Sequence, residues 1–165
     1  MKISAFKIGG RTIKTVIAVF LCFLVDSMRK SGMPFYAAIA AILCIQRNSE
    51  ESFKVAVNRE IATIIGGIWG MLTLVIEKNV YIIPYELLRY LFLSLMLIPI
   101  IHFSVLIKQE KGTFLMCVVF LCITVTHSND QNPLTFGLSR IVDTTIGIVI
   151  ALFINQFKKY RMDSE

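Results

Sequence analysis

Charged residues are scarce in this sequence, since only 17% of its 165 residues are Asp, Glu, Lys or Arg. Soluble domains carry about 25% charged and about 45–50% apolar residues. Here 56% of the residues are hydrophobic and the mean hydropathy is +0.71. This excess does not fit one soluble core, but it fits several segments that have lipid as their solvent. The length allows one domain and leaves no room for a separate soluble one.

The sequence also lacks the patterns of common catalytic and metal sites. It has no phosphate-binding glycine loop, no zinc-ligand cluster and no Ser/His/Asp constellation. Its four cysteines lie inside apolar runs, and no two of them have C-x-x-C spacing. Buried cysteines of this kind usually pack as small apolar residues, and they give no disulfide framework. We therefore expect neither an enzyme nor a bound metal or cofactor.

Six apolar segments are present, at residues 13–25, 33–45, 61–76, 80–107, 114–126 and 134–157. Only helices and closed barrels cross lipid, and no segment alternates with period two. We therefore predict an all-α integral membrane protein with six transmembrane helices, forming one transmembrane domain over residues 1–165. A simple span needs about 20 residues. The segments 33–45 and 114–126 are shorter, so whether they cross completely stays open.

The basic residues are distributed unevenly between the loops, and the net charge is +6 with a pI of about 9.3. They lie between apolar runs and form no patch with aromatics, so we do not expect nucleic-acid binding. With six spans, 12 of the 17 fall on the side of both termini and 5 on the other. The positive-inside rule then places the N- and C-termini in the cytoplasm. Asp26–Lys30 offers no cleavage site, so the first helix is expected to be uncleaved.

Three local signals predict helix starts and one ion pair. Ser49, followed by two glutamates, is typical of an N-cap with an acidic first turn. Asn132-Pro133 is a second start, with Asn as cap and Pro at the first position. Glu86 and Arg89 are three residues apart on the fourth helix, which favours a local ion pair.

The sequence resembles itself at an offset of 81 residues. Arg59-x-x-x-Thr63-x-x-Gly66 matches Arg140-x-x-x-Thr144-x-x-Gly147, and the short segments 33–45 and 114–126 coincide. Gln46 then aligns with His127. Three helices per repeat reverse the direction of the chain, so we predict a 3+3 inverted repeat with halves of about 1–79 and 80–165. Paired short segments in such folds point to a binding site.

Several stretches follow one another along the chain, namely Gly10–Thr15, Pro34–Ala41, Gln46, Ser52, Arg59…Thr63…Gly66-Gly67 and Arg140-x-x-Asp143-Thr144-x-x-Gly147. In this order they resemble the aromatic acid exporter family, which is related to fusaric-acid-resistance-like membrane proteins of bacteria. The resemblance covers nearly the whole chain in order. It implies a six-helix unit in the bacterial cell membrane that exports aromatic carboxylates, with protons as a candidate driving force. Larger relatives fuse two units or add a soluble domain, for which this chain has no length, so a homo-oligomer, most simply a dimer, is expected.

Asp143 is the sharpest candidate for chemistry, because it lies about 10 residues beyond Pro133 and therefore roughly 15 Å along a helix. A carboxylate at that depth is costly and faces a partner or a water-filled cavity. It could accept a proton or gate the substrate, or it could form an ion pair with Arg140 that only fixes the helix. Arg59 and Arg140 could hold a carboxylate by paired hydrogen bonds, or they could anchor to headgroups. The further candidates for substrate binding or coupling are Thr63, Thr144, Gln46 and His127.

The glycines of the long segments are predicted to serve helix packing. Gly66-x-x-x-Gly70 is a small-residue pattern that lets two helices approach closely, within one chain or at a dimer seam. Gly67 and Gly147 belong to the same group.

Two functions from different classes fit these patterns. The first is a secondary exporter of small organic anions, in the lipid bilayer. The second is a non-transporting scaffold or accessory subunit of an envelope complex. Substrate-dependent flux would separate them.

Overall fold

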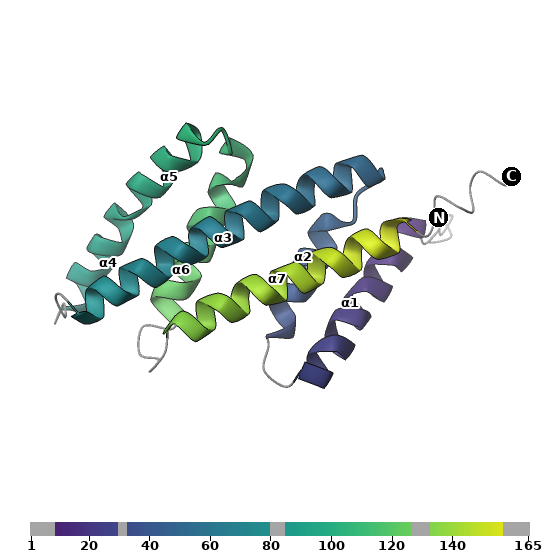
Figure 1. Ribbon diagram of the computed structural model, residues 1–165, viewed down its shortest axis with the longest axis horizontal. Coiled ribbons are helices and arrows are strands. Elements are labelled where there is room, and N and C mark those ends of the chain that lie inside the picture. Colours follow the sequence, from purple (N-terminus) through teal and green to yellow (C-terminus); the bar gives the residue numbers. More distant parts are fainter. Residues whose placement is uncertain (1–8, 30–32, 80–84, 127–132, 157–165) are drawn as a thin grey trace, which may run out of the picture. The chain divides into compact units, whose positions relative to one another are not determined.

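The computed structural model describes residues 9–29, 33–79, 85–126 and 133–156, and every regular element within these ranges is helical (Figure 1). The predicted all-α class is therefore confirmed for the described residues. The elements are α1 (Gly10–Arg29), α2 (Pro34–Cys44), α3 (Ser49–Asn79), α4 (Glu86–Leu95), α5 (Leu97–Leu106), the short 3-10 helix η1 (Glu110–Gly112), α6 (Thr113–Thr126) and α7 (Pro133–Gln156).

The chain forms two compact units, each described here by itself. Unit 1 comprises residues 1–56 and 145–165, and unit 2 comprises residues 57–144. Unit 1 thus holds α1, α2, the start of α3 and the end of α7. Unit 2 holds the rest of α3, then α4 to α6, and the start of α7. Both sequence halves, 1–79 and 80–165, contribute to both units.

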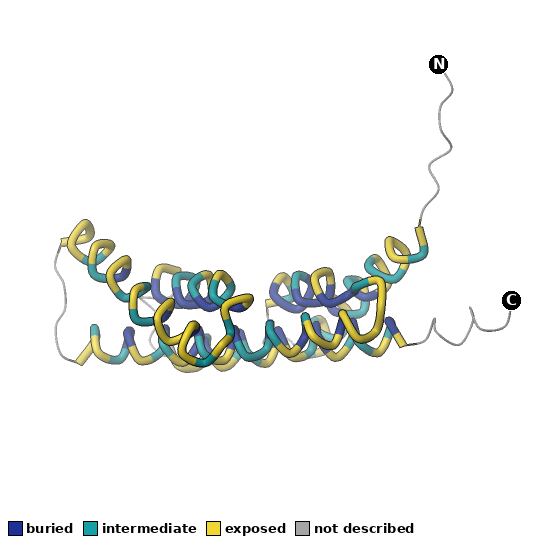
Figure 2. Tube along the Cα trace, turned by 90° about the horizontal axis from the view of Figure 1, so that it is seen from above, coloured by how far each residue is buried: buried dark blue, intermediate teal, exposed yellow. Residues whose placement is uncertain are grey.

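Among the described residues, three helical stretches are long and apolar enough to cross a membrane, namely Ser49–Asn79, Glu86–Leu106 and Leu134–Gln156. Along α3, Ile64, Ile68, Leu72 and Ile76 recur every four residues and are all exposed. Such an apolar outer stripe suits contact with lipid. Figure 2 shows that exposed and buried residues alternate along the helices. The short helices α2 and α6 have 11 and 14 residues. Six complete spans therefore stay a prediction.

Helix α1 is longer than the apolar segment 13–25 that predicted it. It begins at Gly10 and runs through Arg29. The Ser27 hydroxyl donates to the Leu24 carbonyl oxygen at 2.7 Å, and Arg29 sits in the last turn. A cation there interacts favourably with the helix dipole. The polar residues continue the helix beyond its apolar part.

The fourth segment is interrupted, since α4 ends at Leu95 and α5 begins at Leu97. Pro99 has no backbone N–H, so the Leu95 carbonyl oxygen cannot receive the usual bond from four residues later. Met96 lies between the two helices, and Pro99 explains the break because proline is a common cause of helix kinks. Pro84 lies outside the described residues.

The two predicted helix starts agree with the structure to within one residue. Helix α3 begins at Ser49 itself, with Glu50 and Glu51 in its first turn. Helix α7 begins at Pro133. The proposed cap Asn132 lies outside the described residues.

Candidate functional site

Helices α3 and α7 run antiparallel and side by side in unit 2. A Cβ built on Gly67 would lie 3.5 Å from Ile141 Cδ1, and one on Gly137 would lie 2.6 Å from Met71 Cγ. Residue 67 is thus level with 141, and residue 71 with 137. This register fixes the heights of the candidate residues along the two helices.

Most candidate residues predicted from the sequence are buried in unit 2. Thr63 and Thr144 are each 1% exposed, Asp143 is 2% exposed, and Arg59 and Arg140 are each 5% exposed. Arg59 and Thr63 come from α3, and the other three come from α7. Burial of ionised groups to this degree costs several kcal/mol unless polar groups surround them. Their placement inside the unit, while apolar side chains cover its outside, marks a functional candidate.

The register places the two threonines at nearly the same height. Arg59 precedes Thr63 by four residues, which is about 6 Å along α3, and Arg140 precedes Thr144 by the same distance along α7. Because the helices are antiparallel, the arginines lie on opposite sides of the threonine level, roughly 13 Å apart along the axis. Asp143 directly precedes Thr144 in α7, so it lies at nearly the same height as the two threonines.

This arrangement combines three kinds of polar chemistry. A guanidinium donates two parallel hydrogen bonds to a carboxylate, and it holds its charge at any physiological pH. The threonine hydroxyls both donate and accept. Asp143 adds a carboxylate, whose two oxygens accept hydrogen bonds. We call Arg59, Thr63, Arg140, Asp143 and Thr144 the buried polar set.

The remaining two candidates do not join the buried polar set. Gln46 belongs to unit 1, where its backbone N–H donates to Ser52 Oγ at 3.0 Å and its side-chain amide donates to the Leu43 carbonyl oxygen at 2.7 Å. His127 lies outside the described residues.

Gln46 is part of a polar cluster, which we call the unit 1 end cluster. Lys14 Nζ donates to Asn155 Oδ1 at 2.7 Å and to the Asn155 carbonyl oxygen at 3.2 Å. Asn155 Nδ2 in turn donates to Ser52 Oγ at 2.6 Å. Arg11 Nε donates to the Ile45 carbonyl oxygen at 3.0 Å, just past the end of α2. The cluster joins α1 to the ends of α2 and α7 and to the start of α3.

The sequence analysis missed Asn155, although a signal for it was present. It is an amide in the last turn of the apolar segment 134–157, and it is buried. A polar side chain at such a place needs partners from neighbouring helices.

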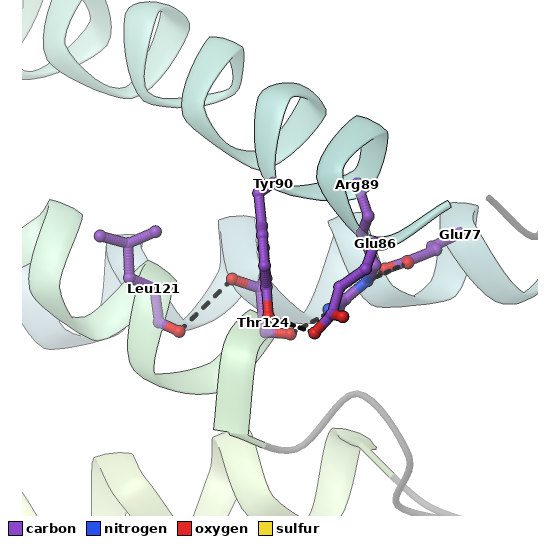
Figure 3. A network of polar contacts seen from close by, with 6 residues as sticks. All are labelled: Glu77, Glu86, Arg89, Tyr90, Leu121 and Thr124. Atoms are coloured by element: carbon purple, nitrogen blue, oxygen red, sulfur yellow. Dashed lines mark hydrogen bonds and ion pairs between the residues drawn. The ribbon is translucent and has the colours of Figure 1, made fainter. Parts of the chain in front are cut away.

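A second cluster, the unit 2 end cluster, centres on Arg89 (Figure 3). Its guanidinium forms an ion pair with Glu77, with Nη2 to Oε2 at 3.2 Å, and Nη2 also donates to the Thr124 carbonyl oxygen at 2.7 Å. Both charged side chains are largely buried. Arg89 thereby connects α4 to the ends of α3 and α6.

The predicted ion pair between Glu86 and Arg89 is wrong. Glu86 instead accepts a hydrogen bond from the Tyr90 hydroxyl at 2.7 Å (Figure 3). Arg89 turns inward because Glu77 is sheltered from water and because the last carbonyls of α6 have no partner within their own helix. A pair between Glu86 and Arg89 on the surface of one helix would stabilise the helix by only about 0.2–0.5 kcal/mol.

The glycines of the long helices face the short helices at close range. A Cβ on Gly66 would lie 2.5 Å from the Met116 carbonyl oxygen, and one on Gly70 would lie 3.0 Å from Ile123 Cβ. The Gly66-x-x-x-Gly70 face is thus occupied by α6 of the same chain. In unit 1, a Cβ on Gly147 would lie 2.1 Å from the Ala37 carbonyl oxygen of α2. Gly67 differs, since its Cβ would make only ordinary contacts.

Within the described residues, no three or more His, Cys, Asp or Glu side chains gather in a way that could hold a metal ion.

Comparison with known proteins gives a family for the chain. A sequence model described as aromatic acid exporter family member 1 matches residues 6–157. The chain is 30% identical over 154 residues to a UPF0421 protein of Bacillus cereus (strain ATCC 10987), covering 91% of this chain and 39% of that protein. It is 27% identical over 150 residues to the UPF0421 protein YgaE of Bacillus subtilis, covering 90% and 39%. The chain therefore spans about two fifths of the length of these relatives. No solved structure matches.

Proposed function

Because the chain belongs to the aromatic acid exporter family, we propose that it exports small organic anions across a bacterial cell membrane, with aromatic carboxylates as the substrate class. The buried polar set carries this proposal. Two threonine hydroxyls lie at nearly the same height inside a unit whose outer surface is apolar, and the two arginines lie on opposite sides of that height. Such a set can replace the hydration shell of a carboxylate, which lipid cannot do.

Asp143 provides the coupling in this proposal. It lies one turn from Arg140 on α7, so its carboxylate and a substrate carboxylate compete for the same guanidinium. Protonation of Asp143 removes this competition, and substrate loading then depends on pH. A membrane potential that is negative inside favours the exit of an anion by about 2.3 kcal/mol per charge per 100 mV.

The proposal includes six spans with an inverted repeat and both termini in the cytoplasm. Two correspondences support the repeat. Gly66 of the first half packs on α6 of the second, and Gly147 of the second half packs on α2 of the first. Likewise, Arg11 and Arg89 each lie near the start of a half and donate to the carbonyl oxygen at the end of that half's short helix. Such pairs are expected when two halves share one architecture.

A homo-oligomer, most simply a dimer, completes the proposal. Equivalent positions of the two long helices carry exposed apolar residues, such as Val57 with Leu138 and Ile68 with Val149. Two such stripes offer a surface for a second copy within the bilayer. Native mass measurement of the protein in nanodiscs tests the copy number.

Flux measurements test the export function. The purified protein is reconstituted in liposomes, a pH gradient is imposed, and the flux of a panel of aromatic carboxylates is followed. We expect gradient-driven flux that Asp143→Asn abolishes and that Asp26→Asn leaves unchanged, because Asp26 lies near the end of α1 and outside the buried polar set. Flux that survives Asp143→Asn makes that residue structural and leaves export intact.

The absence of flux from folded protein would overturn export. It would favour the alternative function, a non-transporting membrane scaffold or accessory subunit of an envelope complex. Co-purification with one defined partner from native membranes would then support that alternative.

A further inference from the structure

One end of unit 1 carries more positive than negative charge. The cations there are Arg11, Lys14, Arg47 and Lys54, and the carboxylates are Glu50 and Glu51. The two glutamates occupy the first turn of α3, where the helix dipole stabilises them. Arg11 and Arg47 are exposed, and within the described residues neither of them forms an ion pair. This end of the unit therefore has positive charge that its own carboxylates do not balance.

Arg11 is held at the end of α2 and keeps most of its donors. Its Nε donates to the Ile45 carbonyl oxygen at 3.0 Å, which satisfies one of the carbonyls that the end of a helix leaves without a partner. A guanidinium has five N–H donors, and this bond occupies one of them. The other donors lie on the two Nη nitrogens, which have no hydrogen-bond acceptor in the part of the chain that the structure describes. They are available to an acceptor from outside the protein.

The unit 1 end cluster places further cations beside Arg11. Lys14 lies about one turn further along α1 and donates to Asn155 Oδ1 at 2.7 Å, and Asn155 Nδ2 donates to the Gln46 carbonyl oxygen at 3.4 Å. Arg11 and Asn155 thus bind the carbonyl oxygens of two consecutive residues, and Arg47 follows directly. Because these contacts already order Arg11 and Lys14, an anion that binds here orders few further side chains.

An exposed apolar stripe on α2 leads up to these cations. It consists of Phe35, Ile39, Ile42 and Leu43, whose spacing places them on one face of the helix. Three of them are exposed, at 62% for Phe35, 46% for Ile42 and 47% for Leu43. The stripe is roughly 12 Å long at about 1.5 Å per residue, and one leaflet of the bilayer core is about 15 Å deep. An acyl chain therefore fits along α2 while its headgroup reaches Arg11 and Arg47.

We propose that this end of unit 1 binds an anionic phospholipid, whose phosphate contacts Arg11 and Arg47 and whose acyl chain covers the stripe on α2. Guanidinium groups bind phosphate by paired, charge-assisted hydrogen bonds. A headgroup with a cation of its own, such as that of phosphatidylcholine, offers no net charge to balance the cluster. The inference goes beyond the proposed export and rests only on unit 1 lying in a membrane. In the proposed topology the lipid belongs to the cytoplasmic leaflet.

Native mass spectrometry of the full chain in a neutral detergent tests the site. Phosphatidylglycerol and phosphatidylcholine are added separately at equal concentrations, and the fraction of protein with one bound lipid is measured. We expect phosphatidylglycerol to bind about tenfold more tightly, since each cation near an anionic headgroup strengthens binding. Glycerol 3-phosphate carries a phosphate without acyl chains and should not displace the lipid at an equal concentration.

Removal of charge locates the site. Arg11→Gln combined with Arg47→Gln should weaken phosphatidylglycerol binding by about tenfold. Arg47→Gln alone should weaken it by about threefold, and this variant leaves the bond from Arg11 to the end of α2 in place. Lys108→Gln combined with Lys111→Gln is the matched control, because it removes two exposed cations of unit 2 that lie on the same side in the proposed topology. The control should leave lipid binding unchanged.

Equal binding of the two lipids to the native chain would overturn the proposal, as would unchanged binding in the Arg11 and Arg47 double variant. Equal weakening in both double variants would also overturn it, because general charge rather than this cluster would then attract the lipid. Displacement of phosphatidylglycerol by glycerol 3-phosphate would reject a lipid site in favour of a phosphate site. None of these results depends on flux, so the export function is tested separately.

Discussion

Gly147 touches the backbone of Ala37, since a Cβ at position 147 would lie 2.1 Å from the Ala37 carbonyl oxygen and 2.8 Å from Ala40 Cβ. The contact joins α7 to the short helix α2, which comes from the other half of the sequence. Backbone atoms cannot move aside as a flexible side-chain end can. The approach of these two helices therefore depends on the missing side chain at position 147.

We expect Gly147→Ala and Gly66→Ala to destabilise the protein by about 1–3 kcal/mol each, the usual cost of forcing an extra carbon into a packed interior. Thermal unfolding in detergent, followed by circular dichroism, measures the effect.

Gly67→Ala is the matched control for Gly66→Ala. The added carbon would meet Ile141 at 3.5 Å, which is ordinary contact. Alanine in place of glycine favours a helix by about 1 kcal/mol, so the control should be neutral or stabilising. Equal losses at positions 66 and 67 would contradict the packing described for α6.

The partner of Arg89 can be tested by double-mutant cycles. We expect a coupling of about 1–3 kcal/mol between Arg89→Met and Glu77→Gln, because removal of either charge leaves the other sheltered and unpaired. The cycle of Arg89→Met with Glu86→Gln should give a coupling near zero. Unfolding in detergent at several urea concentrations supplies the free energies. A larger coupling with Glu86 would restore the pair expected from the sequence.

Substrate binding should depend on the guanidinium geometry of the buried polar set. Arg140→Lys keeps the charge but loses the paired hydrogen bonds, so we expect KM for an aromatic carboxylate to rise by about tenfold or more. Arg47→Lys is the control, because Arg47 is exposed and lies outside the set. Liposome flux at several substrate concentrations separates KM from the maximal rate. An unchanged KM in Arg140→Lys would remove Arg140 from the binding site.

The six-span topology predicts opposite sides for two exposed positions. In a variant whose four native cysteines are replaced by alanine, Met33→Cys should react with an impermeant reagent from outside intact cells. Arg47→Cys should react only after the cells are opened. These positions flank the short helix α2, so labelling of both from one side would show that α2 does not cross the membrane.

The sequence by itself determined the all-α class, the positions of most helices and the family. Long apolar runs in a chain with 17% charged residues require internally bonded backbones, and that requirement is local. The same holds for the helix starts at Ser49 and Pro133, where capping depends on neighbouring residues. The depth of Asp143 could also be expected, since it lies about 10 residues beyond the helix start at Pro133. The sequence left open whether Arg59 and Arg140 are buried or anchored to headgroups.

Only the tertiary structure decided which polar groups meet. Arg89 pairs with Glu77, twelve residues away, and not with its helical neighbour Glu86, because a sheltered carboxylate and an unsatisfied helix end lie together only after three helices pack. Asn155 reaches Lys14 and Ser52 across more than one hundred residues of sequence. Helix periodicity predicts the face that a side chain occupies, but its partners depend on how distant helices pack.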